Sequence, residues 1–95
     1  MMNKIKRRAI ITGKVQGVWF RQSTADRANE LGLSGWVRNL SDGQVEVVME
    51  GEKSIVDEMI DWLHKGPPLS KVASVKISTG PPEAIAPPFT LRPTR

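Results

Sequence analysis

The residues best suited to chemistry lie in one short stretch, GKVQGVWFR at positions 13–21. It leads from a strand-like run into a helix-like run. Backbone N–H groups at such a turn, together with a helix N-terminus, favour an anion at their common centre. Gly17 permits conformations in which consecutive amides converge, and Arg21 adds a planar fork that matches two phosphate oxygens. The stretch therefore predicts a cradle for a phosphate-like anion. Without this context, a single arginine after a phenylalanine is usually a surface charge.

Other phosphate and metal signatures do not fit. Gly13 and Lys14 resemble the end of a Walker motif, but Arg8 stands where glycine is required and Val15 where serine or threonine is required. A third glycine for a dinucleotide fingerprint is missing. The sequence has no cysteine and 1 histidine, so it offers no thiolate or histidine-rich zinc site. We expect neither a metal nor a cofactor, and we expect His64 to have no catalytic role.

The charge balance favours anionic partners. The net charge is +4 and the isoelectric point is about 9.9, which suits small phosphorylated molecules, nucleic acid or acidic lipid headgroups. The densest basic cluster, residues 4–8, is most simply a solvated strand end. No apolar run is long enough to cross a membrane, and no apolar segment follows the basic N-terminus as in a signal peptide. We therefore expect a cytoplasmic protein with no membrane partner.

The first half of the sequence predicts a strand, a helix and a hairpin. Residues 5–12 are rich in β-branched types, and residues 22–31 carry apolar side chains on one helical face, with Gly32 at the C-cap position. The runs at 33–40 and 44–50 flank Ser41-Asp42-Gly43, a strong hairpin signal. In the second run, valine and methionine alternate with polar residues, which predicts a half-buried strand.

The second half predicts a helix and two strands. Residues 54–65 show the helical spacing of apolar side chains, and Ser54 with Asp57 resembles a capping box. Residues 71–79 alternate as a strand, and Phe89-Thr90-Leu91-Arg92 can add a short edge strand after a proline-rich loop. The 95 residues suit one domain. The order β-α-β-β-α-β predicts an α+β, ferredoxin-like split βαβ fold, with an antiparallel four-stranded sheet, a short edge strand and two helices on one face.

This element order is shared with RNA-recognition domains, which stack bases on aromatic residues of the third strand. Here that strand reads QVEVVME, which is acidic and has no aromatic ring. The GLSG at 32–35 matches the GxxG of KH domains but joins a helix to a strand and lacks basic neighbours. A nucleic-acid partner is therefore not expected.

Three motifs together resemble the acylphosphatase family: GKVQGVWFR, then ANELGLSGWVRN, then DGQVEVVMEG. They occur in the family's order and spacing, and the resemblance extends to FTLR near the end of the sequence. VQGVxFR and GWVRN are unlikely to occur together by chance. The sequence departs from the family only in its basic N-terminal lead and in the proline-rich loop before the last strand.

The resemblance implies a hydrolase that cleaves acyl phosphates to a carboxylate and inorganic phosphate, in a ferredoxin-like fold. It implies that Arg21 binds the phosphoryl oxygens and that Asn39 positions the attacking water. It also implies that phosphate is bound by the main-chain amides of a loop, together with Arg21, at Gln16, Gly17, Val18, Trp19, Phe20 and Arg21.

Some roles stay open at this stage. Trp19 either borders the acyl group or shields the turn from water, and Lys14 either steers the substrate or is simply solvated. Trp36 and Trp62 are expected to be packing residues. The alternatives to the enzyme are a non-catalytic acylphosphatase-like accessory module, like the domain at the front of large hydrogenase-maturation carbamoyltransferases, and a basic nucleic-acid-binding module. Because the sequence ends after one domain, we expect the free-standing enzyme, and a monomer.

Overall fold

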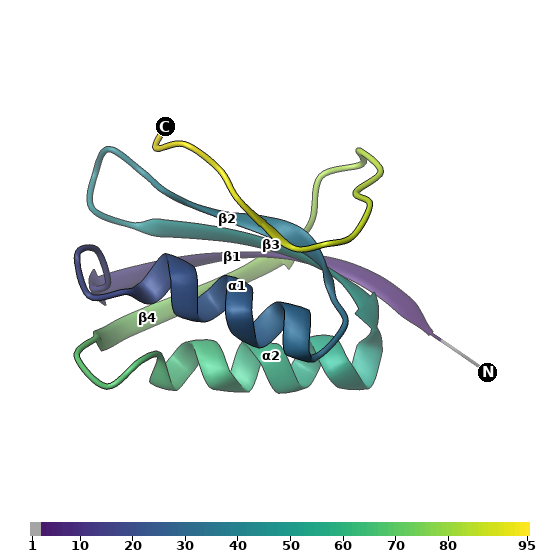
Figure 1. The fold of residues 1–95 in the computed structure, drawn as a ribbon, viewed down its shortest axis with the longest axis horizontal. Coiled ribbons are helices and arrows are strands. Elements are labelled where there is room, and N and C mark those ends of the chain that lie inside the picture. Colours follow the sequence, from purple (N-terminus) through teal and green to yellow (C-terminus); the bar gives the residue numbers. More distant parts are fainter. Residues whose placement is uncertain (1–2) are drawn as a thin grey trace.

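The computed structural model describes residues 3–95, which form a sheet with two helices on one face (Figure 1). The elements, in chain order, are β1 (Lys4–Lys14), α1 (Phe20–Glu30), β2 (Ser34–Asn39), β3 (Val45–Glu52), α2 (Lys53–Lys65), β4 (Lys71–Thr79) and β5 (Thr90–Leu91). The strand order across the sheet is β4-β1-β3-β2-β5. The first four strands are antiparallel, and β5 pairs with β2 in parallel. The predicted ferredoxin-like fold and its short edge strand are confirmed.

The core lies between the sheet and the two helices. Inward-facing residues of the central strands, such as Val37 and Val47, meet α1 at Ala25 and Ala28 and are fully or almost fully buried. The two alanines allow α1 to pack closely on the sheet, since a small side chain lets two backbones approach. The core therefore fixes the position of the first turn of α1 relative to β2.

Helix α1 ends as predicted, at a glycine. Gly32 has φ +74°, and its N–H donates to the carbonyl of Asn29 while the N–H of Leu33 donates to Ala28. This pair of bonds is a Schellman motif, which needs a residue in the left-handed region. The hairpin between β2 and β3 is also confirmed: the N–H of Gly43 donates to Leu40, and Asp42 accepts from the backbone of residue 44.

Two sequence-based predictions are wrong. Ser54 and Asp57 do not form a capping box, because the helix begins one residue earlier, with Glu52 at the N-cap and no side-chain cap. Asp57 instead pairs with Lys53 at 2.8 Å, one helical turn away, and Ser54 donates to the Glu52 carboxylate. The spacing of Ser54 and Asp57 fits a capping box, but the Asp57 carboxylate takes part in a surface ion pair instead.

The second error concerns β3, which is buried on both faces. Val45, Val47 and Met49 face the helices as predicted, but Glu46 and Val48 on the opposite face are only 6% and 0% exposed. The strand is central, so large side chains from both neighbouring strands cover it. Polar and apolar residues alternate along β3 because one face packs on the helices and the other contains a buried ion-pair cluster.

Candidate active site

The loop between β1 and α1, residues 15–19, has an unusual backbone. Gly17 has φ +71°, and Trp19 has φ +64°, although it is not a glycine. A side chain at φ near +60° is strained, at a cost of roughly 1–2 kcal/mol. Left-handed residues next to right-handed ones form concave nests of backbone N–H groups, and Trp19 directly precedes the helical Phe20. The loop therefore has the local geometry of an anion cradle.

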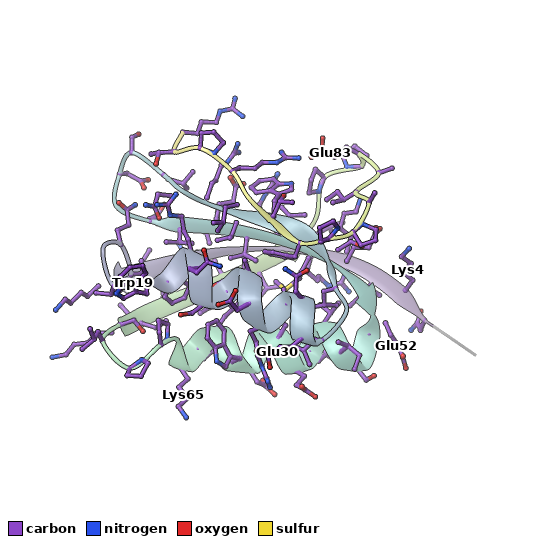
Figure 2. The ribbon with its side chains drawn as sticks, viewed as in Figure 1. Lys4, Trp19, Glu30, Glu52, Lys65 and Glu83 are labelled. Carbon is purple, nitrogen blue, oxygen red and sulfur yellow. The ribbon has the colours of Figure 1, made fainter. Side chains whose placement is uncertain are left out.

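The same loop leads into the N-terminus of α1, which has no side-chain cap. Trp19 is the N-cap of α1, its side chain makes no capping hydrogen bond, and the first turn has no acidic residue. The first N–H groups of any helix lack intrahelical partners. Figure 2 shows Trp19 at the end of the molecule where α1 begins, and 75% of this residue is exposed.

A pocket of about 330 Å³ lies beside this helix end. It brings together Gly17, Trp19, Phe20 and Arg21 from the loop and helix with Asn39 from the end of β2, as the sequence predicts. Asn39 reaches the pocket because β2 runs beside β3 and ends next to the loop, as the arrangement in Figure 1 shows. The site is thus assembled from two segments that the sheet brings side by side.

Arg21 and Asn39 both have free polar groups at this pocket. Within residues 3–95, the Arg21 guanidinium takes part in no ion pair and no side-chain hydrogen bond, although the side chain is half-buried. The Asn39 side-chain oxygen Oδ1 is buried and has no hydrogen-bond partner among the same residues. Buried polar atoms are normally paired, so an unpaired one at a pocket is suited to a ligand or water.

Two predicted cradle residues do not line the pocket with their side chains. The amide of Gln16 donates to the carbonyls of Leu40 and Gln44, both at 2.8 Å, and so ties the loop to the β2–β3 hairpin. Val18 is 6% exposed and belongs to the core cluster. Their side chains anchor the loop at its two sides, and only their backbones remain for a ligand.

Three further residues, Val15, Gln22 and Leu91, line the pocket and were not identified from the sequence. Leu91 lies in β5, and its place in the wall depends on the parallel pairing of β5 with β2. No local pattern predicts a pairing between segments so far apart. Gln22, in the first turn of α1, could have been proposed from its helical position directly after Arg21.

The remaining candidates lie outside the pocket. Lys14 and His64 are exposed and are not among its lining residues. Trp36 is 2% exposed, and the Trp62 ring packs 6.1 Å from the ring of Phe20, so both are packing residues as predicted. Within residues 3–95, no group of three or more His, Cys, Asp or Glu side chains could hold a metal ion. No helix in that range is long and apolar enough to cross a membrane.

Comparisons with known proteins agree with the motifs. The acylphosphatase family model matches residues 7–90. An acylphosphatase of Rubrobacter xylanophilus is 51% identical over 85 residues, covering 90% of this chain and 77% of that protein. The structure of an acylphosphatase from Coxiella burnetii superposes with a TM-score of 0.88 at 40% identity, covering 95% of this chain and 94% of the other.

The same fold also occurs inside a larger protein. T. kodakarensis HypF matches with a TM-score of 0.82 at 31% identity, covering 96% of this chain but 12% of HypF. This chain covers only a small part of HypF, whereas it covers most of the Rubrobacter acylphosphatase. The family match extends from β1 to the first residue of β5. The chain belongs to the acylphosphatase family of enzymes.

Proposed function

We propose that the pocket beside the start of α1 hydrolyses acyl phosphates, with the phosphoryl group bound by the backbone amides of residues 16–20 and by Arg21. Asn39 orients the water that attacks phosphorus. The observation that carries this assignment is the meeting of two unpaired polar groups, the Arg21 guanidinium and the Asn39 Oδ1, at one pocket. Membership of the acylphosphatase family supports the reaction class.

The phosphoryl group of an acyl phosphate carries up to two negative charges spread over three oxygens, and this site offers donors suited to those oxygens. The guanidinium presents two parallel N–H groups, which match two oxygens of one phosphoryl group. The amides of the strained loop and of the uncapped helix end supply further donors and the positive end of the helix dipole. Because these donors are part of a fixed backbone, they need little reorganisation when charge develops on the equatorial oxygens.

The reaction needs no general acid. The oxygen of a water molecule forms a new bond to phosphorus while the bond from phosphorus to the acyl oxygen breaks. The electrons of that bond leave with the carboxylate, which is a weak base and departs without a proton. The attacking water loses its proton to solvent or to the product phosphate. This explains how a pocket without a histidine or carboxylate in its lining can catalyse the step.

Asn39 has a positioning role in this scheme. An amide oxygen is not a base near neutral pH, but it can accept a hydrogen bond from water and hold it in line with the leaving oxygen. The unpaired Oδ1 at the pocket is available for this bond. Trp19 and Leu91, both exposed and both lining the pocket, supply apolar surface on which an acyl group can rest.

The test is release of phosphate from benzoyl phosphate by the wild-type protein beside Arg21→Ala, in EDTA. An arginine at a phosphoryl-transfer transition state contributes about 10³- to 10⁵-fold in rate, so we expect a loss of at least about 10³-fold and loss of inorganic phosphate binding. Lys14→Ala is the matched control, because it removes an exposed positive charge beside the loop and leaves the pocket lining intact.

Two results would reject the proposal. One is equal activity of wild type and Arg21→Ala. The other is salt-sensitive binding of mixed DNA or RNA by a wild-type protein that releases no phosphate, which would support a nucleic-acid-binding module instead.

A further inference from the structure

The face of the sheet that carries no helix contains a second pocket, of about 370 Å³. Four arginines line it, together with a tryptophan and a glutamate: Arg8, Arg38, Arg92, Arg95, Trp36 and Glu83. We call it the outer pocket. Figure 2 shows Glu83 above the sheet and Lys65 below it on α2, so the two labels mark the opposite sides of the molecule. The outer pocket shares no lining residue with the pocket around Arg21.

A buried carboxylate holds two of the arginines in place. Glu46 is 6% exposed, and its oxygens lie 2.9 Å from Nε of Arg8 and 2.7 Å from both Nε and Nη2 of Arg38. One carboxylate therefore faces two guanidinium groups. The Arg38 side chain is only 15% exposed, so solvent screens its excess charge weakly.

A buried ring holds the next arginine. The guanidinium carbons of Arg38 and Arg92 lie 4.6 and 4.4 Å from the centroid of the Trp36 ring, which is itself 2% exposed. Cation–π contacts of this kind fix the direction of a guanidinium group. The only carboxylate paired with Arg92 in residues 3–95 is Glu83, at 3.8 Å, and both side chains are about half exposed. Such an exposed pair neutralises little charge.

The charges in the outer pocket do not balance. Among the side chains, the four arginines contribute +4 and Glu46 and Glu83 contribute −2, which leaves +2. The α-carboxylate of Arg95 lowers this excess to +1. Like charges held close together repel, so this arrangement costs free energy when the pocket is empty. An anion bound between the guanidinium groups would remove the repulsion.

We propose that the outer pocket binds a compact, multiply charged phosphate oxoanion, such as a diphosphate group, through Arg92 and Arg95. Arg8 and Arg38, which are paired with Glu46 in the same pocket, contribute their excess positive charge. Planar guanidinium groups bind phosphate oxygens in pairs, which favours phosphate over a singly charged ligand. The pocket offers no exposed ring for stacking, because Trp36 is 2% exposed and its ring is in contact with the guanidinium groups of Arg38 and Arg92. This favours a free phosphate compound over a nucleic acid strand, whose bases stack on aromatic side chains.

The experiment is a titration of ¹⁵N-labelled protein with pyrophosphate, followed by amide NMR. Two sets of signals should shift: residues 16–21 at the first pocket, and residues 36–38 with 92–95 at the outer pocket. Arg21→Ala should weaken the first set and leave the second unchanged. The outcome for the outer pocket is therefore independent of the outcome for the proposed hydrolase site.

The variant for the outer pocket is Arg92→Gln with Arg95→Gln. It leaves Arg8 and Arg38 in place, so the buried Glu46 keeps both of its partners and the fold is preserved. We expect at least a tenfold loss of pyrophosphate affinity in the second set of signals only. Lys53→Gln with Lys65→Gln is the charge-matched control on α2, where both side chains are exposed; it should retain the affinity of the wild type.

Three outcomes would overturn the proposal. The first is absence of shifts at residues 36–38 and 92–95 at millimolar pyrophosphate. The second is an equal loss of affinity in the arginine variant and the lysine control, which would show attraction by net charge alone. The third is binding of a single-stranded oligonucleotide that shifts the same signals, is tighter than pyrophosphate and strengthens with strand length, which would assign the outer pocket to nucleic acid.

Discussion

At the scale of single residues, Arg21 and Asn39 line the same pocket but have different proposed tasks. A guanidinium binds the phosphoryl group in the ground state and in the transition state, whereas an oriented water matters only for the reaction. Removing each side chain should therefore change binding and turnover in different proportions.

Asn39→Ala should lose turnover by at least about tenfold and retain its affinity for inorganic phosphate. The physical reason is that the unpaired Oδ1 contacts water in the proposed scheme, while phosphate is held by the loop and Arg21. Phosphate affinity is measured by competitive inhibition of benzoyl phosphate hydrolysis and, independently, by calorimetry. Loss of phosphate affinity equal to the loss of turnover would contradict the positioning role.

The loop residues of the candidate site could be predicted because they are local, whereas Asn39 lies outside that stretch and was predicted only from the resemblance to the acylphosphatase family. Glycines, the arginine and the helix start all lie within nine consecutive positions, and their chemistry follows from the residue types. The direction of each side chain could not be predicted in the same way. Gln16 and Val18 read as members of a phosphate loop, yet one side chain reaches the hairpin and the other enters the core. Those directions depend on tertiary contacts.

At the scale of elements, the loop at 15–19 depends on the hairpin between β2 and β3. Gln16 bonds to the carbonyls on both sides of that hairpin, and Asn39 ends the strand that leads into it. The two bonds therefore fix the distance between the anion cradle and the residue proposed to hold water.

Gln16→Leu should lower kcat/KM for benzoyl phosphate by about tenfold and cost about 1–2 kcal/mol of unfolding free energy, because two partly buried hydrogen bonds are lost. The affected carbonyls keep a backbone donor each, which limits the cost. Activity is measured at a temperature where circular dichroism shows a folded protein, and stability by urea unfolding.

Gln44→Leu is the control for this variant, since residue 44 bonds to Gln16 through its backbone carbonyl alone. It should leave both quantities near their wild-type values. If both variants lose activity to the same extent, hydrophobic substitution near the hairpin is the cause, and the link between loop and hairpin has no special role.

The elements themselves were predictable where one pattern acts alone. The strand at 71–79 and the helix end at Gly32 follow from alternation and from a left-handed cap. The predictions failed where two patterns compete. Ser54 and Asp57 fit both a cap and an i,i+4 surface pair, and alternation in β3 fits both solvent exposure and a buried ion-pair cluster.

At the scale of the whole molecule, the proposed chemistry has no titrating partner near neutral pH. The side chains that line the first pocket include no histidine and no carboxylate. We expect kcat/KM to be flat across neutral pH and unchanged by EDTA, after subtraction of spontaneous substrate hydrolysis at each pH. A bell-shaped pH profile centred near 7 would indicate a catalytic histidine. Inactivation by EDTA would indicate a catalytic metal ion.

If the proposed site is the active one, the parallel pairing of β5 with β2 also sets the point during synthesis at which it is complete. Leu91, in β5, completes the wall of a pocket that also includes Val15, in the loop after β1, so segments far apart in the sequence meet in one pocket. A nascent chain that has already folded α1 still lacks that wall. The first appearance of phosphate release would therefore report that β5 has paired with β2.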